Sequence, residues 1–76
     1  MNQTIERAPE YRICRSSTYA DRWIAEDGKT WVNDPTSAKV FRDEAEARDF
    51  AAEHEIVFST RSYGQTWIDD ETYTSP

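Results

Sequence analysis

The single cysteine, Cys14, constrains how this chain of 76 residues can fold more than any other feature of the sequence. One cysteine excludes an internal disulfide, whereas secreted mini-proteins of this length usually contain two or more cysteines. A domain this small also buries only about 60% of the surface that its unfolded chain exposes. The fold must therefore depend on an apolar core, and a reducing cytoplasm is the simplest compartment for it.

Aromatic residues can supply that core, because the chain contains three Trp, four Tyr and three Phe beside only two Gly. Large apolar side chains separate this sequence from disordered chains of similar charge content. We expect one small domain over residues 1–76, with mobile termini at residues 1–9 and 70–76. The first ten residues contain no apolar run typical of a signal peptide, and no stretch approaches the eighteen apolar residues of a membrane span.

Alternating residues predict the first strands of a sheet. Residues 11–15 have the period of a strand, and residues 21–26 and 29–32 flank Asp27-Gly28, a strong hairpin signal. A two-residue loop at this position places Glu26 opposite Lys29, where they can form an ion pair. The register that follows pairs Ala25 with Thr30, Ile24 with Trp31, and Trp23 with Val32. Each face of this hairpin carries a Trp. We expect one to pack under the helix, the other to be partly covered, and at least two of the three Trp to lie in the core.

A helix is predicted from Glu44 to about His54. Asp43 and Glu46 form a variant of the capping box at its start, and residues 33–35 form a turn before it. One stripe of this helix should pack on the sheet, namely Ala47, Phe50, Ala51 and His54. Residues 56–60 and 65–69 are predicted strands, joined by a turn at residues 62–64. The fold class is therefore α+β: a mainly antiparallel sheet of four to five strands with one α-helix packed on one face.

Reactive groups are few, so the sequence indicates no enzyme. His54 is the only imidazole and Cys14 the only thiol, and we interpret both as structural residues. There is no glycine-rich phosphate loop, no metal-ligand spacing and no nucleophile elbow. We therefore expect no catalytic residue, no cofactor and no metal. A net charge of −6 also disfavours direct binding to nucleic acid or to an anionic membrane.

Carboxylates and aromatic residues form the candidate site instead. Three acids step along the helix beside its apolar stripe, at intervals of roughly 5 Å for a rise of 1.5 Å per residue. A row of fixed negative charge can occupy a basic groove that normally holds a phosphate backbone. Aromatic anchors with charged rims are common in tight interfaces. The predicted partner-binding residues are Glu46, Asp49, Glu53, Asp69, Asp70, Glu71, Trp31 and Tyr63. A solvated helix face is the alternative interpretation of the helix acids.

The segment from Trp31 to Phe41, followed by residues 44–47 and by Phe50-Ala51, resembles the hairpin, turn and helix of small acidic phage and mobile-element proteins. These proteins include anti-CRISPR inhibitors of type I systems, and the resemblance covers about residues 11–60. It implies a stoichiometric inhibitor that docks on a crRNA-guided surveillance complex (Cascade), or on its recruited nuclease, in the host cytoplasm. The resemblance does not assign a binding role to any particular residue of this chain. Seven arginines argue against mimicry of DNA by the whole surface.

Two functional hypotheses follow. In the first, the chain is an inhibitory binding module that an acidic patch steers to a basic groove. In the second, it is a small intracellular interaction domain, such as a homodimer that buries its spare Trp and a sheet edge against a second copy.

Overall fold

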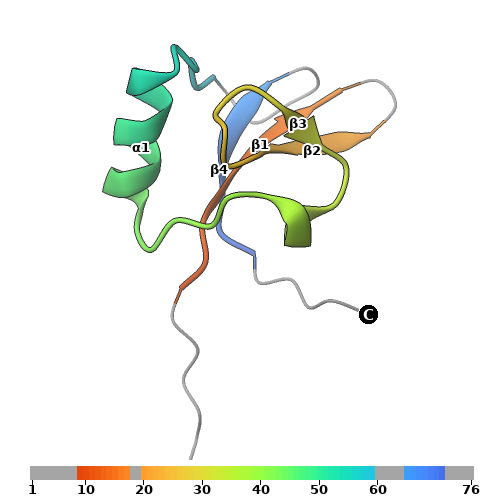
Figure 1. Ribbon diagram of the computed structural model, residues 1–76, viewed down its shortest axis with the longest axis horizontal. Helices are drawn as coiled ribbons and strands as arrows, with labels where there is room; N and C mark the ends of the chain where they lie inside the picture. The colour runs from red at the N-terminus through yellow and green to blue at the C-terminus, as the bar shows by residue number, and fades with distance from the viewer. Residues whose placement is uncertain (1–8, 18–19, 60–64, 72–76) are drawn as a thin grey trace, which may run out of the picture.

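The computed structural model describes residues 9–17, 20–59 and 65–71. Within these residues, the structure has four strands: β1 (Arg12–Ser16), β2 (Asp21–Ile24), β3 (Trp31–Val32) and β4 (Thr66–Asp69). They form one antiparallel sheet in the order β3-β2-β1-β4. A 3₁₀ turn, Pro35–Ser37, and one α-helix, α1 (Glu44–Glu53), separate β3 from β4 along the chain (Figure 1). The α+β class predicted from the sequence is confirmed.

The hairpin of β2 and β3 has the predicted register, since Trp23 pairs with Val32 and Ile24 with Trp31. The prediction of a two-residue loop was wrong. The Gly28 N–H donates to the Ala25 carbonyl at 3.1 Å, so Glu26 and Asp27 occupy the centre of the turn. Gly28 follows it with φ of +72°, in the left-handed region that glycine enters without steric cost.

The predicted ion pair across that loop, between Glu26 and Lys29, is also corrected. Glu26 lies 3.2 Å from the Nζ of Lys39 instead. The longer loop explains the difference, because Lys29 no longer stands directly opposite Glu26. Its backbone N–H donates to the Asp27 carboxylate at 2.8 Å.

The second predicted hairpin does not form as expected. Residues 56–59 are not a strand, residues 60–64 lie outside the described residues, and β4 pairs with β1 rather than with the segment before it. The chain that leaves α1 is held by the helix itself, because the Ile56 N–H donates to the Ala51 carbonyl at 2.8 Å. The Ser59 N–H donates to the Thr66 carbonyl, also at 2.8 Å, so the end of this segment contacts the start of β4.

Helix α1 begins and packs as the sequence predicts. The Asp43 side chain caps it by accepting from the Glu46 N–H at 2.8 Å. Ala47 and Ala51 are buried, and they belong to the apolar cluster that contains Phe41. Phe50 is half-buried, with its ring centroid 5.1 Å from that of Phe41.

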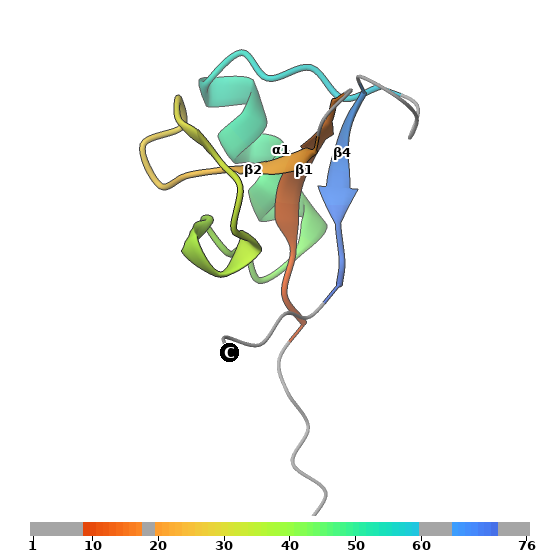
Figure 2. The ribbon, with the colours of Figure 1, turned by 90° about the vertical axis from the view of Figure 1, so that its right-hand side faces the viewer.

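The sheet separates two apolar clusters. On the helix side, Ile13 and Ile24 pack with Phe41 and with the buried alanines of α1. On the other side, Cys14 and Trp23 pack with Ala38, which directly follows the 3₁₀ turn. Figures 1 and 2 show α1 on one face of the sheet and the 3₁₀ turn away from the helix. Trp23 is thus the buried tryptophan of the hairpin, on the face opposite the helix, whereas Trp31 is half-buried on the helix side.

Candidate functional site

The three predicted helix acids, Glu46, Asp49 and Glu53, are all exposed on α1. Among the described residues, no cationic group lies within 4 Å of their carboxylates. The neighbouring Glu44 does pair with Arg48, as predicted, although at 3.9 Å and with both side chains largely exposed. The carboxylates of this row are therefore available to a partner.

The negative charge of the chain is concentrated on this helix. Residues 43–55 contain six carboxylates and only one basic residue, Arg48, so they carry −5 of the net charge of −6. The remaining residues are close to neutral. A molecule of this kind presents one strongly anionic element rather than an evenly acidic surface.

Glu46, one of the three exposed acids of α1, also makes hydrogen bonds at the start of the helix. Its Oε2 accepts from the Arg42 N–H at 3.5 Å, while its own N–H donates to Asp43. In a capping box, the Glu46 side chain would accept from the backbone N–H of Asp43. Here it accepts from the N–H of the preceding residue, Arg42. Asp49 and Glu53 make no such contact to the backbone among the described residues, so they are the cleaner probes of the acidic surface.

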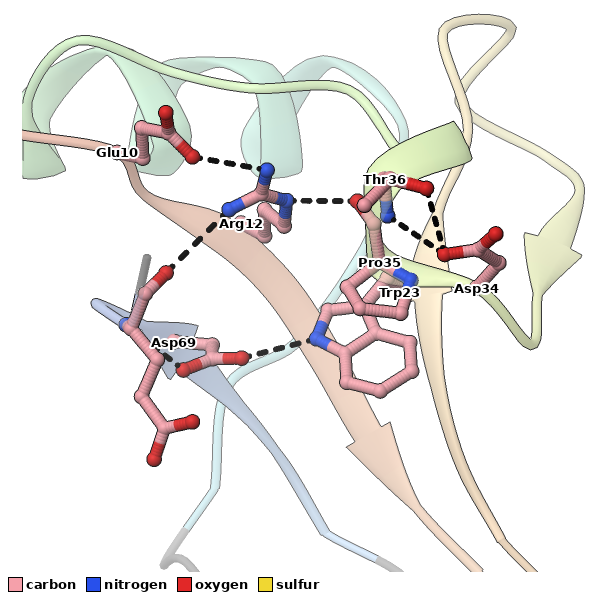
Figure 3. A network of polar contacts seen from close by, with 8 residues as sticks. Glu10, Arg12, Trp23, Asp34, Pro35, Thr36 and Asp69 are labelled. Carbon is pink, nitrogen blue, oxygen red and sulfur yellow. Dashed lines mark hydrogen bonds and ion pairs between the residues drawn. The ribbon is translucent and has the colours of Figure 1, made fainter. Parts of the chain in front are cut away.

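Asp69, one of the predicted partner-binding residues, does not belong to an exposed acidic surface. It is 3% exposed. Its Oδ2 accepts from the indole N–H of Trp23 at 2.9 Å, and its Oδ1 accepts from the Glu71 N–H at 3.1 Å (Figure 3). Burial of a carboxylate requires such donors, because an unsatisfied charge in the interior is costly. Asp69 therefore connects β4 to β2 through Trp23.

Arg12 lies in the same region and is 3% exposed. Its Nε donates to the Pro35 carbonyl at 2.7 Å, and its Nη2 bonds Glu10 at 2.9 Å (Figure 3). Its Nη1 donates to the Glu71 carbonyl at 3.3 Å. Asp70 and Glu71 are exposed, but both follow β4, and this contact makes the backbone of Glu71 part of the framework. They belong to a different element from the acids of α1.

Trp31 lies beside cations rather than beside the acidic row. The Arg15 Cζ is 4.0 Å from the centroid of the Trp31 ring. These two residues, with Ser17 and Arg22, line a hollow of about 310 Å³. The predicted site residue Tyr63 lies outside the described residues. The structure therefore divides the predicted site into an acidic helix, a buried carboxylate and an arginine-lined hollow.

Sequence reasoning missed both Arg15 and Arg22. The two arginines are separated in sequence by the segment that includes residues 17–20. They come together because β1 pairs with β2, which places Arg15 directly opposite Arg22. The hairpin predicted from the sequence contained only residues 21–32, so that prediction did not bring the two arginines side by side.

Cys14 and His54 belong to different parts of the core. Cys14 is buried in the cluster opposite the helix, whereas the His54 ring lies against Phe50, with 4.3 Å between their centroids. The pair is thus not arranged as a nucleophile and its base. Within the described ranges, no group of three or more His, Cys, Asp or Glu residues is placed to hold a metal ion. No helix in the described part of the chain has the length and apolar character needed to cross a membrane.

Together, these observations define a small α+β domain with a helix-covered, four-stranded antiparallel sheet and one acidic helix face. Comparisons with protein-family models, with curated proteins and with solved structures found no match to this chain. Its function is therefore argued from the residues and their geometry.

Proposed function

We propose that this chain is a stoichiometric protein-binding inhibitor that docks the acidic face of α1 on a basic, nucleic-acid-binding groove of another protein. The observation that carries the proposal is the exposed row of Glu46, Asp49 and Glu53, for which no cation of the described residues lies within 4 Å. The backbone that carries these carboxylates is already ordered in a capped helix, so binding does not have to order it.

The charge distribution supports an electrostatic mode of binding. Because the helix segment carries almost all of the net negative charge, the molecule would approach a basic groove with α1 leading. Such steering raises association rates by 10- to 10³-fold and weakens as salt rises. The specific partner that we propose, from the resemblance in residues 11–60, is a subunit of a type I crRNA-guided surveillance complex, whose DNA-binding groove the chain would block.

The direct experiment measures target-DNA binding by a purified type I surveillance complex as the chain is added. We expect DNA binding to be lost at about one equivalent of the chain, and the loss to be relieved at high salt. DNA binding that is unaffected by a large excess of the chain would exclude this partner.

The acidic row is tested by a charge-matched pair of variants. Asp49→Asn with Glu53→Gln removes two charges from α1, and Asp21→Asn with Glu26→Gln removes two exposed charges elsewhere. We expect the first variant to associate about tenfold more slowly with the partner and the second to behave like the parent chain. Equal association rates for both variants would contradict the role of the helix acids. Sedimentation of the free chain checks the homodimer alternative.

A further inference from the structure

A pair of arginines lies side by side on the helix-side face of the sheet. Arg15 on β1 and Arg22 on β2 are directly opposite each other in the antiparallel register. Since side chains alternate along a strand, they share the face that carries Ile13 and Ile24. Both arginines are exposed, and with Ser17 and Trp31 they line the hollow of about 310 Å³.

Among the residues that the structure describes, neither guanidinium group has an acidic partner. Like charges directly opposite each other destabilise a pair of strands. Within the described residues, no carboxylate lies within 4 Å of Arg15 or Arg22, although the chain has an excess of acids. Arg12, Lys39 and Arg48 each do pair with a glutamate. The hollow is therefore a local positive site in an acidic molecule.

Trp31 organises one of these cations. The Arg15 guanidinium lies over the Trp31 ring at 4.0 Å, and its Nε donates to the Thr66 Oγ1 at 3.4 Å. Stacking on a ring holds the plane of a guanidinium while its edge keeps N–H donors for a ligand. The Ser17 hydroxyl donates to the Ala20 carbonyl at 2.6 Å. Ser17 therefore lines the hollow, but its hydroxyl hydrogen is already used and is not available to a ligand.

We propose that this hollow binds a phosphomonoester, with its phosphate between Arg15 and Arg22 and its organic part against Trp31. The charge of the site selects the ligand class, because two adjacent cations are balanced by a phosphate of nearly −2 and not by a single carboxylate. Guanidinium forks also match phosphate oxygens in a bidentate geometry. The remaining volume of the hollow accommodates an aromatic or sugar group next to the indole. This site is independent of the acidic face of α1.

The test is an NMR titration of the ¹⁵N-labelled full chain with phenyl phosphate, inorganic phosphate and benzoate. We expect phenyl phosphate to shift the amides of Arg15, Ser17, Arg22 and Trp31 in a saturable way. Inorganic phosphate should bind at the same residues but more weakly, because it has no organic part to contact Trp31. Benzoate has the ring but only one charge, and we expect it to bind at least about tenfold more weakly than phenyl phosphate.

Variants assign the effect to the arginine pair. Arg22→Gln should weaken phenyl phosphate binding about tenfold, and Arg22→Lys, which keeps the charge but loses the fork, by a smaller factor. Arg42→Gln removes an exposed arginine elsewhere and should leave the affinity unchanged. The dispersion of the amide spectrum verifies that each variant is folded. The Asp49→Asn/Glu53→Gln variant should bind phenyl phosphate like the parent, whatever the fate of the inhibitor proposal.

Three results would overturn the proposal. The first is the absence of saturable shifts at these residues up to about 10 mM phenyl phosphate, a concentration at which even weak binding is detected. The second is an equal affinity of the parent chain and of the folded Arg22→Gln variant. The third is benzoate binding as tight as that of phenyl phosphate, which would remove the argument for a dianion.

Discussion

Gly28 is the residue at which backbone conformation and packing constrain the sequence most tightly. Its φ of +72° lies in the left-handed region, and a Cβ built at this position would overlap the His54 imidazole. The His54 ring also lies against the Phe50 ring, which limits its movement on that side. Gly28 is therefore required both by the backbone conformation of the turn and by the His54 ring beside it.

We predict that Gly28→Ala destabilises the fold by about 2–4 kcal/mol, from left-handed backbone strain together with overpacking. In a His54→Ala background the same substitution should cost only about 1–2 kcal/mol, because the overlap is gone and the strain remains. A double-mutant cycle from urea denaturation measures the difference. Equal costs in both backgrounds would mean that the His54 ring does not limit this position.

Glu55 adopts the conformation that helices usually assign to glycine after their last turn, with φ of +57°. The Ile56 N–H donates to the Ala51 carbonyl and the Glu55 N–H to the Ala52 carbonyl, at 2.8 and 3.4 Å, which is the Schellman motif. The chain therefore ends α1 in the standard manner but with a strained residue.

We predict that Glu55→Gly stabilises the chain by about 0.5–1 kcal/mol, since relief of strain exceeds the added entropy of the unfolded chain. A rise in Tm of roughly 4–8 °C per kcal/mol is expected for a domain of this size. Glu55→Gln is the control, because it removes the charge and keeps the Cβ. A similar rise in Tm for both variants would attribute the gain to charge rather than to backbone conformation.

Among the elements, the β2–β3 loop depends on a single carboxylate. Asp27 accepts from the Lys29 N–H, the Thr30 N–H and the Thr30 hydroxyl, at 2.8, 2.8 and 2.6 Å. The Thr30 side chain, followed by the backbone N–H groups, lowers the pKa of Asp27 from 3.8 to about 2. Because the pKa is lower in the folded state, the ionised group stabilises the loop above about pH 4. That stabilisation is lost as the pH falls through the folded pKa of about 2.

We predict that Thr30→Val raises the pKa of Asp27 toward its ordinary value, since its largest hydrogen-bond contribution disappears. Carboxyl ¹³C NMR titration of the parent chain and the variant measures the shift directly. The pKa of Asp34, which the side chain and the backbone N–H of Thr36 lower at the start of the 3₁₀ turn, serves as the internal control and should not move. An unchanged Asp27 pKa in the folded variant would contradict the assignment.

At the scale of the whole molecule, Arg12 joins segments that are far apart in the sequence. Its guanidinium bonds the 3₁₀ turn, Glu10 before β1 and Glu71 after β4 (Figure 3). The sheet alone does not hold these pieces, because none of them belongs to a strand. Arg12 therefore secures the end of the molecule where the chain enters β1 and leaves β4.

We predict that Arg12→Lys destabilises the chain by about 2–4 kcal/mol, because one buried ammonium cannot reach three partly buried acceptors that lie in different directions. Arg22→Lys, at an exposed position of β2, should change stability by less than about 0.5 kcal/mol. Urea denaturation of both variants provides the comparison. Equal transition midpoints would show that the Arg12 contacts add nothing to stability.

The predicted and observed structures agree on α1 and on the hairpin register, although the two-residue loop expected at Asp27-Gly28 was wrong. Asp43 and the apolar stripe at helical spacing located α1, and the pairing of Trp23 with Val32 was predicted correctly. The candidate site was predicted less well. The exposure of Glu46, Asp49 and Glu53 follows from helical periodicity. Asp69, in contrast, is of a residue type that is usually exposed, and yet it is buried.

The sequence by itself determined the fold class, the helix and the hairpin register, because caps, turns and periodicity act within a few residues of the chain. Only the tertiary structure decided that β4 joins β1, that residues 56–59 remain outside the sheet, and that Arg15 faces Arg22. Trp23 meets Asp69 across 46 positions and Arg12 meets Glu71 across 59. Contacts at such separations depend on which strand edges and polar groups meet as the core forms, and no local pattern encodes that choice.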